Sequence, residues 1–139
     1  MAVLYTTRVR AEGGREGSVS STDALLSLRL AAPRALGGRE DATNPEQLFG
    51  AGYAACFESS LLHVAQEAGA YLQGTAVEAM VSIHARENGV YGLSVVLTVE
   101  VGGLSQNDAE QMVMQADAIC PYSNAVRGNI DVQLHTIVR

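Results

Sequence analysis

Apolar and polar residues alternate with a period of two in two neighbouring runs, residues 77–86 and 91–101. This period is typical of strands that bury one face. Asn88-Gly89 lies between the runs, and this dipeptide favours a tight hairpin turn because both residues accept positive φ. The pattern predicts an antiparallel hairpin. The face that the second strand is expected to bury comprises Tyr91, Leu93, Val95, Leu97, Val99 and Val101.

A long helix is predicted over residues 43–67. Asn44 suits the N-cap, Pro45 suits the first helical position because its φ is already helical, and Gln47 stands where a capping box returns a hydrogen bond. Gly69 follows in the C′ role, where a residue with positive φ commonly ends a helix. The signals at the two ends therefore agree on the length of the helix.

The interior of this helix is apolar or small on every side between residues 48 and 57, which is typical of a helix buried within a protein. Cys56 lies in this stretch, so we expect its side chain to lie in a core. Gly50 and Gly52 each cost about 1 kcal/mol relative to Ala in a helix. Such a cost is tolerated where another segment packs closely, and we expect a close neighbour there.

A second helix is predicted after Ser105, which suits the N-cap and is followed three residues later by Asp108. Cys120 falls at the end of the helical pattern, and Pro121 then ends the helix or begins a new turn. Residues 130–138 alternate again and are expected to close the chain as a strand. The apolar stripe of the helix comprises Ala109, Met112, Val113, Ala116 and Ile119.

The N-terminal third contains weaker patterns. Residues 3–10 and 18–30 are predicted as strands, the second from the alternation at its C-terminal end. Between them, three glycines within residues 12–17 surround Arg15 and predict a turn that presents one long cationic side chain. Residues 33–43 are polar and contain glycine, and we expect a loop that could act as a flap.

Together these elements predict an α+β fold, in which antiparallel strands pack around the long central helix and the second helix. A length of 139 residues suits a single domain, residues 1–139. One hydrophobic core is therefore expected.

Composition excludes several classes of partner. Nine Lys and Arg stand against fifteen Asp and Glu, and the net charge of -6 gives no electrostatic footprint for nucleic acid or for an anionic membrane surface. No run is apolar enough to span a bilayer, and the first residues lack the organisation of a signal peptide. We therefore expect a cytoplasmic protein, in which Cys56 and Cys120 are thiols rather than a permanent disulfide.

Cys56 is the first candidate for a catalytic residue, and its thiol needs a nearby cation to become a reactive thiolate. Burial raises the pKa of a thiol, whereas a nearby guanidinium favours the thiolate. Arg15 is the candidate cation, and Glu46 is the carboxylate that could hold it. On a straight helix Glu46 lies about 80° round and roughly 15 Å along the axis from Cys56. A bridging side chain or a carboxylate from a second subunit would meet this geometry, and the alternative without chemistry is that both cysteines merely pack.

Other kinds of site have no support in the sequence. His63, His84 and His135 form no His or Cys pair at metal-ligand spacing, so no metal site is predicted. The chain has no nucleophile elbow, phosphate-binding glycine loop or dinucleotide fingerprint. Residues 120–123, Cys-Pro-Tyr-Ser, are similar to the one-cysteine form of a glutaredoxin box, but they follow a helix late in the chain, whereas such a box follows a strand.

Five motifs, taken together and in order, resemble the organic hydroperoxide resistance proteins, within the larger family that includes osmotically inducible protein C (the OsmC/Ohr family). The likeness extends over essentially the whole chain, and it is closer to the hydroperoxide resistance branch than to its sister branch. The motifs are GGREG at 13–17, TNPEQLF at 43–49, GYAACF at 52–57, CPYSNA at 120–125 and RGN at 127–129.

This resemblance implies a thiol peroxidase that reduces organic and fatty-acid hydroperoxides, built as an intertwined homodimer with active sites at the subunit interface. It implies that Cys56 is the peroxidatic cysteine and Cys120 the resolving cysteine. It also implies that Arg15 activates the thiolate and that Glu46 holds the arginine. No metal or tightly bound cofactor is expected, and the disulfide is expected to be reduced by dihydrolipoamide or a lipoylated protein.

Apolar residues around such a site would favour an alkyl hydroperoxide over hydrogen peroxide, which is small and well hydrated. Two other functions stay open: a peroxide-responsive redox sensor, and a dimer that binds a hydrophobic ligand without turnover. The candidate substrate-binding residues are Leu48, Phe49, Tyr53, Phe57 and Met112.

Overall fold

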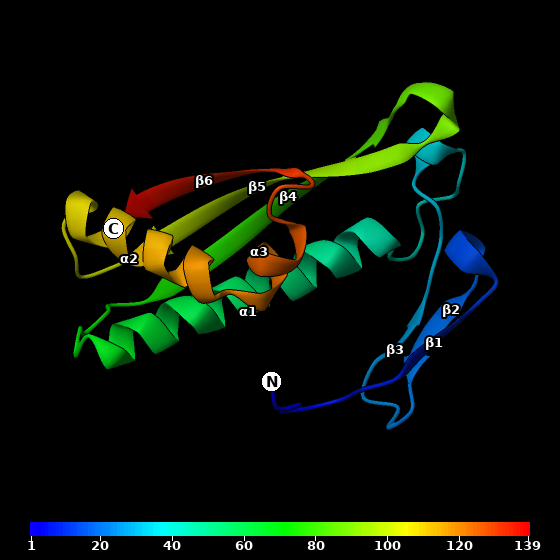
Figure 1. Ribbon diagram of the computed structural model, residues 1–139. Helices are drawn as coiled ribbons and strands as arrows, with labels where there is room; N and C mark the ends of the chain where they lie inside the picture. The colour runs from blue at the N-terminus through cyan, green and yellow to red at the C-terminus, as the bar shows by residue number, and fades with distance from the viewer. The chain divides into compact units, whose positions relative to one another are not determined.

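The computed structural model describes all 139 residues, Met1–Arg139. The chain divides into two compact units, Met1–Leu48 and Phe49–Arg139. The elements, labelled in Figure 1, are β1 Val9–Glu12, the 3-10 turn η1 Gly14–Glu16, β2 Ser18–Ser21, β3 Ser27–Arg29, the 3-10 turn η2 Arg34–Leu36, α1 Pro45–Glu67, β4 Thr75–Ala85, the 3-10 turn η3 Glu87–Gly89, β5 Tyr91–Val101, α2 Gln106–Ile119, α3 Pro121–Val126 and β6 Asp131–Val138.

The N-terminal unit contains a three-stranded antiparallel sheet in the order β1-β2-β3. The predicted glycine turn joins its first two strands as η1. Gly13 and Gly14 have φ values of 82° and 58° there, in the left-handed region that favours glycine. This part of the prediction is confirmed.

The predicted strands at residues 3–10 and 18–30 are wrong in their bounds. The first strand begins only at Val9 and continues to Glu12. Residues 18–30 form two strands that fold back on each other. The turn between them is made by Ser21, whose hydroxyl donates to Asp23 Oδ1 at 2.6 Å and accepts the N–H of Leu26 at 3.0 Å. Ser and Asp side chains that bond nearby backbone compete with a continuous strand, and here they break it.

Helix α1 begins where its capping residues predict. Asn44 Oδ1 accepts the backbone N–H of Gln47 at 2.9 Å, and Pro45 is the first helical residue. The Gln47 side chain does not complete a capping box. Its Oε1 instead accepts the hydroxyl of Thr43 at 2.7 Å.

The end of α1 is also confirmed. Gly69 has a φ of 65°, and its N–H donates to the Gln66 carbonyl at 3.1 Å. The N–H of Ala70 donates to the Ala65 carbonyl at 2.9 Å. This pair of bonds is a Schellman motif, which satisfies carbonyls that the helix itself leaves free.

The C-terminal unit contains a second three-stranded sheet, in the order β4-β5-β6. The predicted hairpin is confirmed, because β4 and β5 pair antiparallel from Ala85↔Tyr91 to Thr75↔Val101. Strand β6 pairs parallel to β5, which the expectation of antiparallel strands did not include. The reason is that α2 and α3 carry the chain back across the sheet before β6 begins. The α+β class is confirmed.

The core of the C-terminal unit lies between this sheet and the helices. In Figure 1, α1 and α2 cover the same face of the sheet. The ends of two expected apolar faces are nevertheless exposed, because Tyr91 begins β5 and Ile119 ends α2. No helix of the chain has both the length and the apolar character needed to cross a membrane. The buried residues at the centre are Tyr53, Phe57 and Leu61 of α1, Val95, Leu97, Val99 and Val101 of β5, and Ala109, Met112, Val113 and Ala116 of α2.

Candidate active site

Two cysteines lie beside each other in the C-terminal unit. Cys56 is half-buried in α1, and Cys120 is fully buried. Cys120 is at once the C-cap of α2 and the N-cap of α3, with an extended backbone that separates the two helices. The separation has a local cause, because Pro121 cannot donate the hydrogen bond that would continue α2, yet it suits the first position of α3.

The sulfur atoms of Cys56 and Cys120 are 4.0 Å apart, and both cysteines are free thiols. A disulfide requires an S–S distance of about 2.05 Å, so the sulfurs have to approach by about 2 Å. Cys120 therefore lies within reach of Cys56. The two residues are 64 positions apart in the sequence, and the fold alone brings them together.

The environment of Cys56 raises the pKa of its thiol. Burial is the largest cause, and the neighbouring Cys120 adds to it. The backbone N–H of Tyr122 acts in the opposite direction, because it stabilises negative charge on the sulfur. No cation of the C-terminal unit contributes. With these neighbours alone Cys56 is mostly protonated at neutral pH, and it needs a positive charge to become reactive.

The two glycines of α1 near Cys56 have close neighbours, as expected from the fact that glycine destabilises a helix and is tolerated where another segment packs closely. A Cβ on Gly52 would lie 2.8 Å from the Tyr122 hydroxyl and 3.1 Å from two carbons of its ring. A Cβ on Gly50 would lie 3.3 Å from a methyl group of Val81 on β4. Glycine at position 52 thus lets the aromatic ring that follows Cys120 pack directly on α1.

The N-terminal unit holds a second pair, Arg15 and Glu46. The guanidinium on η1 donates two hydrogen bonds to the carboxylate in the first turn of α1, Nη1 to Oε2 at 2.7 Å and Nη2 to Oε1 at 2.5 Å. The Glu46 side chain is 16% exposed and that of Arg15 34%. The bond from Arg15 lowers the pKa of Glu46, and the same bond raises the pKa of Arg15. Both groups are therefore charged, and the guanidinium is held in one orientation.

Glu16 contributes to this arrangement, although the GGREG motif that contains it gave it no predicted role. Its Oε1 accepts the backbone N–H of Ala32 at 3.2 Å. This bond fastens the turn that carries Arg15 to the segment before η2. The acceptor and donor are 16 residues apart, so no local pattern could have revealed the bond.

The predicted apolar residues differ in how much surface they leave free. Tyr53 and Phe57 are fully buried, and Met112 is 9% exposed. All three belong to the core of the C-terminal unit. Leu48 and Phe49 are half-buried. Only the last two keep surface with which another molecule could make substantial contact.

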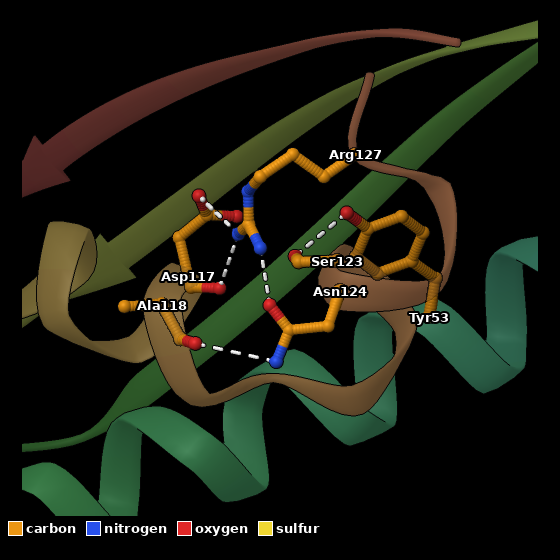
Figure 2. A network of polar contacts seen from close by, with 6 residues as sticks. All are labelled: Tyr53, Asp117, Ala118, Ser123, Asn124 and Arg127. Carbon is orange, nitrogen blue, oxygen red and sulfur yellow. Dashed lines mark hydrogen bonds and ion pairs between the residues drawn. The ribbon is translucent and has the colours of Figure 1, made fainter. Parts of the chain in front are cut away.

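Tyr53 also has a polar role that its place in an apolar pattern did not suggest. Its hydroxyl and that of Ser123 form a hydrogen bond of 2.7 Å, with Tyr53 fully buried and Ser123 3% exposed (Figure 2). Tyr53 stands three residues before Cys56, and Ser123 stands three residues after Cys120. The bond therefore ties together the two segments that carry the thiols.

A second polar cluster surrounds the junction at Cys120 (Figure 2). We call it the Arg127 network; it consists of Asp117, Ala118, Asn124 and Arg127. Arg127 and Asn124 fall within motifs that carry the family resemblance, but no pattern of residues assigned them a role. By contrast, no three His, Cys, Asp or Glu side chains of the chain lie together in a way that could hold a metal ion.

Comparisons with known proteins agree with this architecture. The model of the family described as OsmC-like protein matches residues 38–135. An organic hydroperoxide resistance protein of Xanthomonas axonopodis pv. citri is 46% identical over 134 residues, which cover 95% of this chain and 94% of that protein. The organic hydroperoxide resistance protein OhrB of Bacillus subtilis is 42% identical, over 94% of this chain and 96% of its own.

Solved structures are similar over the same length. The crystal structure of an organic hydroperoxide resistance protein OsmC from Legionella pneumophila superposes with a TM-score of 0.96 at 51% sequence identity. The superposition covers 99% of this chain and 100% of that one.

Proposed function

Because this chain belongs to the OsmC-like protein family, we propose that it is a thiol-dependent peroxidase that reduces organic hydroperoxides to alcohols. The names of its relatives support a part in organic hydroperoxide resistance. One observation carries the proposal of a cysteine mechanism: the Cys120 sulfur lies 4.0 Å from that of Cys56. A second thiol at this distance can trap an oxidised first one without large movement of the chain.

In the proposed reaction the thiolate of Cys56 attacks the distal oxygen of the hydroperoxide. The O–O bond breaks, the alkoxide takes a proton and leaves as the alcohol, and Cys56 becomes a sulfenic acid. The Cys120 sulfur then attacks the Cys56 sulfur, which releases water and forms a disulfide. A dithiol such as dihydrolipoamide, free or on a lipoylated protein, restores both thiols by exchange and is itself oxidised to the disulfide.

We assign to Arg15 the positive charge that Cys56 needs. The pKa of Cys56 is raised by its own unit, and a guanidinium near the sulfur would lower it. The bidentate bond to Glu46 supports this role, because it keeps the arginine charged and oriented. In the proposed homodimer either subunit can supply the arginine.

Substrate preference is proposed to come from the apolar residues Leu48, Phe49, Tyr53, Phe57 and Met112. The buried members, Tyr53 and Phe57, can only shape the wall of a site from behind. We therefore expect Leu48 and Phe49 to make the direct contacts with an alkyl chain. Equal turnover of hydrogen peroxide and a long-chain hydroperoxide would contradict this preference.

The proposal is tested by following the loss of cumene hydroperoxide in the presence of excess dihydrolipoamide. Cys56→Ser should abolish consumption. Cys120→Ser should still react with one hydroperoxide to form the sulfenic acid of Cys56, which a second hydroperoxide then oxidises to the sulfinic acid, detected as a mass increase of two oxygen atoms. A Cys56→Ser protein with full activity would refute the mechanism.

The same assay separates the two other functions. A redox sensor should consume about one equivalent of peroxide per Cys56 and then stop, although the reductant is present. A protein that only binds a hydrophobic ligand should consume none, and its two thiols should be alkylated slowly and at equal rates at neutral pH.

A further inference from the structure

The last turn of α2 lacks a backbone donor that a continuing helix would supply. In an α-helix each carbonyl accepts the N–H four residues later. For the Asp117 carbonyl that residue is Pro121, which has no N–H. A carbonyl at a helix end needs another partner if it is not to stay unsatisfied.

Two side chains from beyond Cys120 supply partners for the end of α2 (Figure 2). Arg127 Nη2 donates to the Asp117 carbonyl at 2.8 Å and to Asp117 Oδ2 at 3.2 Å. Asn124 Nδ2 donates to the Ala118 carbonyl at 3.3 Å. Arg127 Nη1 donates to Asn124 Oδ1, which joins the two capping side chains to each other. The Arg127 network thus closes a ring of polar contacts around the junction.

In the sequence, Cys120 lies between the residues that form the network. Asp117 and Ala118 precede it, and Asn124 and Arg127 follow it. Its backbone is bonded on both sides as well, since its N–H donates to the Ala116 carbonyl and its carbonyl accepts the N–H of Asn124, each at 2.9 Å. The Tyr53–Ser123 bond holds α3 on α1. The angle between α2 and α3, and with it the place of the Cys120 sulfur, is therefore held by these backbone bonds together with the side-chain contacts.

We propose that Arg127 and Asn124 are positioning residues that hold Cys120 within reach of Cys56 and so set how fast an oxidised Cys56 is trapped as the disulfide. This inference rests on the proposed peroxidase function. It gives Arg127 no contact with the hydroperoxide, so the attack of Cys56 on the peroxide should not depend on it.

The exposure of the network suits a junction that moves during the reaction. The Arg127 side chain is 50% exposed and that of Asp117 28%, so water can replace their contacts while the sulfurs close by about 2 Å. When the disulfide is reduced, the same contacts return Cys120 to its place. Without them fewer contacts hold the angle between α2 and α3, and the two sulfurs meet less often.

The test compares Arg127→Met with Arg139→Met as a matched control. Arg139 lies in the same unit, its side chain is 46% exposed, and it contacts Glu100 at 3.5 Å. Reduced protein is mixed with one equivalent of hydroperoxide, the reaction is quenched with an alkylating agent, and the mass of the protein is measured by mass spectrometry. This resolves loss of the Cys56 thiol, formation of the disulfide and formation of the sulfinic acid.

In Arg127→Met the loss of the Cys56 thiol should stay within about twofold of wild type, while disulfide formation should slow by roughly tenfold. With excess peroxide the sulfinic acid should rise correspondingly. Arg139→Met should behave as wild type in every step. Arg127→Lys, which can still donate to the Asp117 carbonyl but cannot bridge to Asn124 at the same time, should lie between the two.

A second readout does not need peroxidase activity. A tenfold loss in the effective concentration of Cys120 at Cys56 makes the reduction potential of the pair about 30 mV less negative, measured against a glutathione buffer. If wild type consumes no hydroperoxide, the proposed function fails, and the potential still decides the inference. If Arg127→Met and Arg127→Lys are folded like the control and leave both the disulfide rate and the potential unchanged, the positioning role is refuted.

Discussion

The hydrogen bond between Tyr53 and Ser123 offers a direct test of how the thiol-bearing segments are held together. The bond is 2.7 Å long, and both residues are buried. Burial also raises the pKa of Tyr53, so its hydroxyl stays protonated and can keep the bond at any ordinary pH. Tyr53→Phe removes one hydroxyl and changes almost no apolar volume.

The expected cost follows from what is left behind. Tyr53→Phe leaves the Ser123 hydroxyl buried without a partner, which costs about 1–3 kcal/mol of unfolding free energy. Ser123→Ala leaves the Tyr53 hydroxyl in the same situation and should cost a similar amount. The double variant leaves no orphaned group, so its cost should be below the sum of the two single costs by about 1 kcal/mol.

The measurement is urea unfolding of the reduced protein at one fixed protein concentration, since association would shift the midpoint. Tyr91→Phe is the matched control, because Tyr91 is 69% exposed and the same atom is removed. It should change the unfolding free energy by less than about 0.5 kcal/mol. Strictly additive costs of the two single changes would refute the reasoning, because they would mean that the two hydroxyls do not depend on each other.

Three other outcomes are expected. The pKa of Glu46 is lowered in the folded state, so its bond to Arg15 stabilises the protein above the unfolded pKa of about 4.3, and this stability is lost as the pH falls through the folded pKa. Wild type should therefore have a higher urea midpoint than Glu46→Gln at neutral pH, and the difference should vanish in acid. The difference should be small because the pair is partly exposed. Arg15→Ala should raise the pKa of Cys56 and slow its alkylation at neutral pH, and an unchanged thiolate titration by ultraviolet absorbance would reject the role of Arg15. Phe49→Ala should raise KM for a long-chain hydroperoxide more than for hydrogen peroxide in steady-state assays, and an equal change for both would exclude Phe49 from substrate contact.

Local signals predicted the elements whose causes are local. The cap at Asn44, the end at Gly69 and the turn at Asn88-Gly89 each depend on residues within a few positions, and the structure has them where the sequence placed them. The turn at Ser21 was missed because the alternating leucines after it extended the strand pattern through it. A period of two records which face is buried, but it does not record where a strand reverses.

Local sequence patterns could not predict contacts between residues that are far apart in the chain. The direction of β6 depends on how α2 and α3 cross the sheet, which no residue of β6 encodes. Tyr53 and Ser123 are 70 positions apart, and each reads as an ordinary member of its own helix. One feature of the sequence did indicate the need for the Arg127 network. A proline four residues after a helical carbonyl always removes the N–H that would donate to that carbonyl. This feature shows that a partner is needed, and only the structure identifies Arg127 as that partner.

The double capping role of Cys120 has a consequence for how this chain can vary in length. One residue ends α2 and begins α3, so no spare residue between them could absorb an insertion or a deletion. Adding one residue would turn α3 by about 100° about its axis and take Ser123 away from Tyr53. The loop at the tip of the β4–β5 hairpin carries no comparable constraint. Among variants of this chain, changes in length should therefore accumulate at residues 86–90 and be absent between residues 117 and 127.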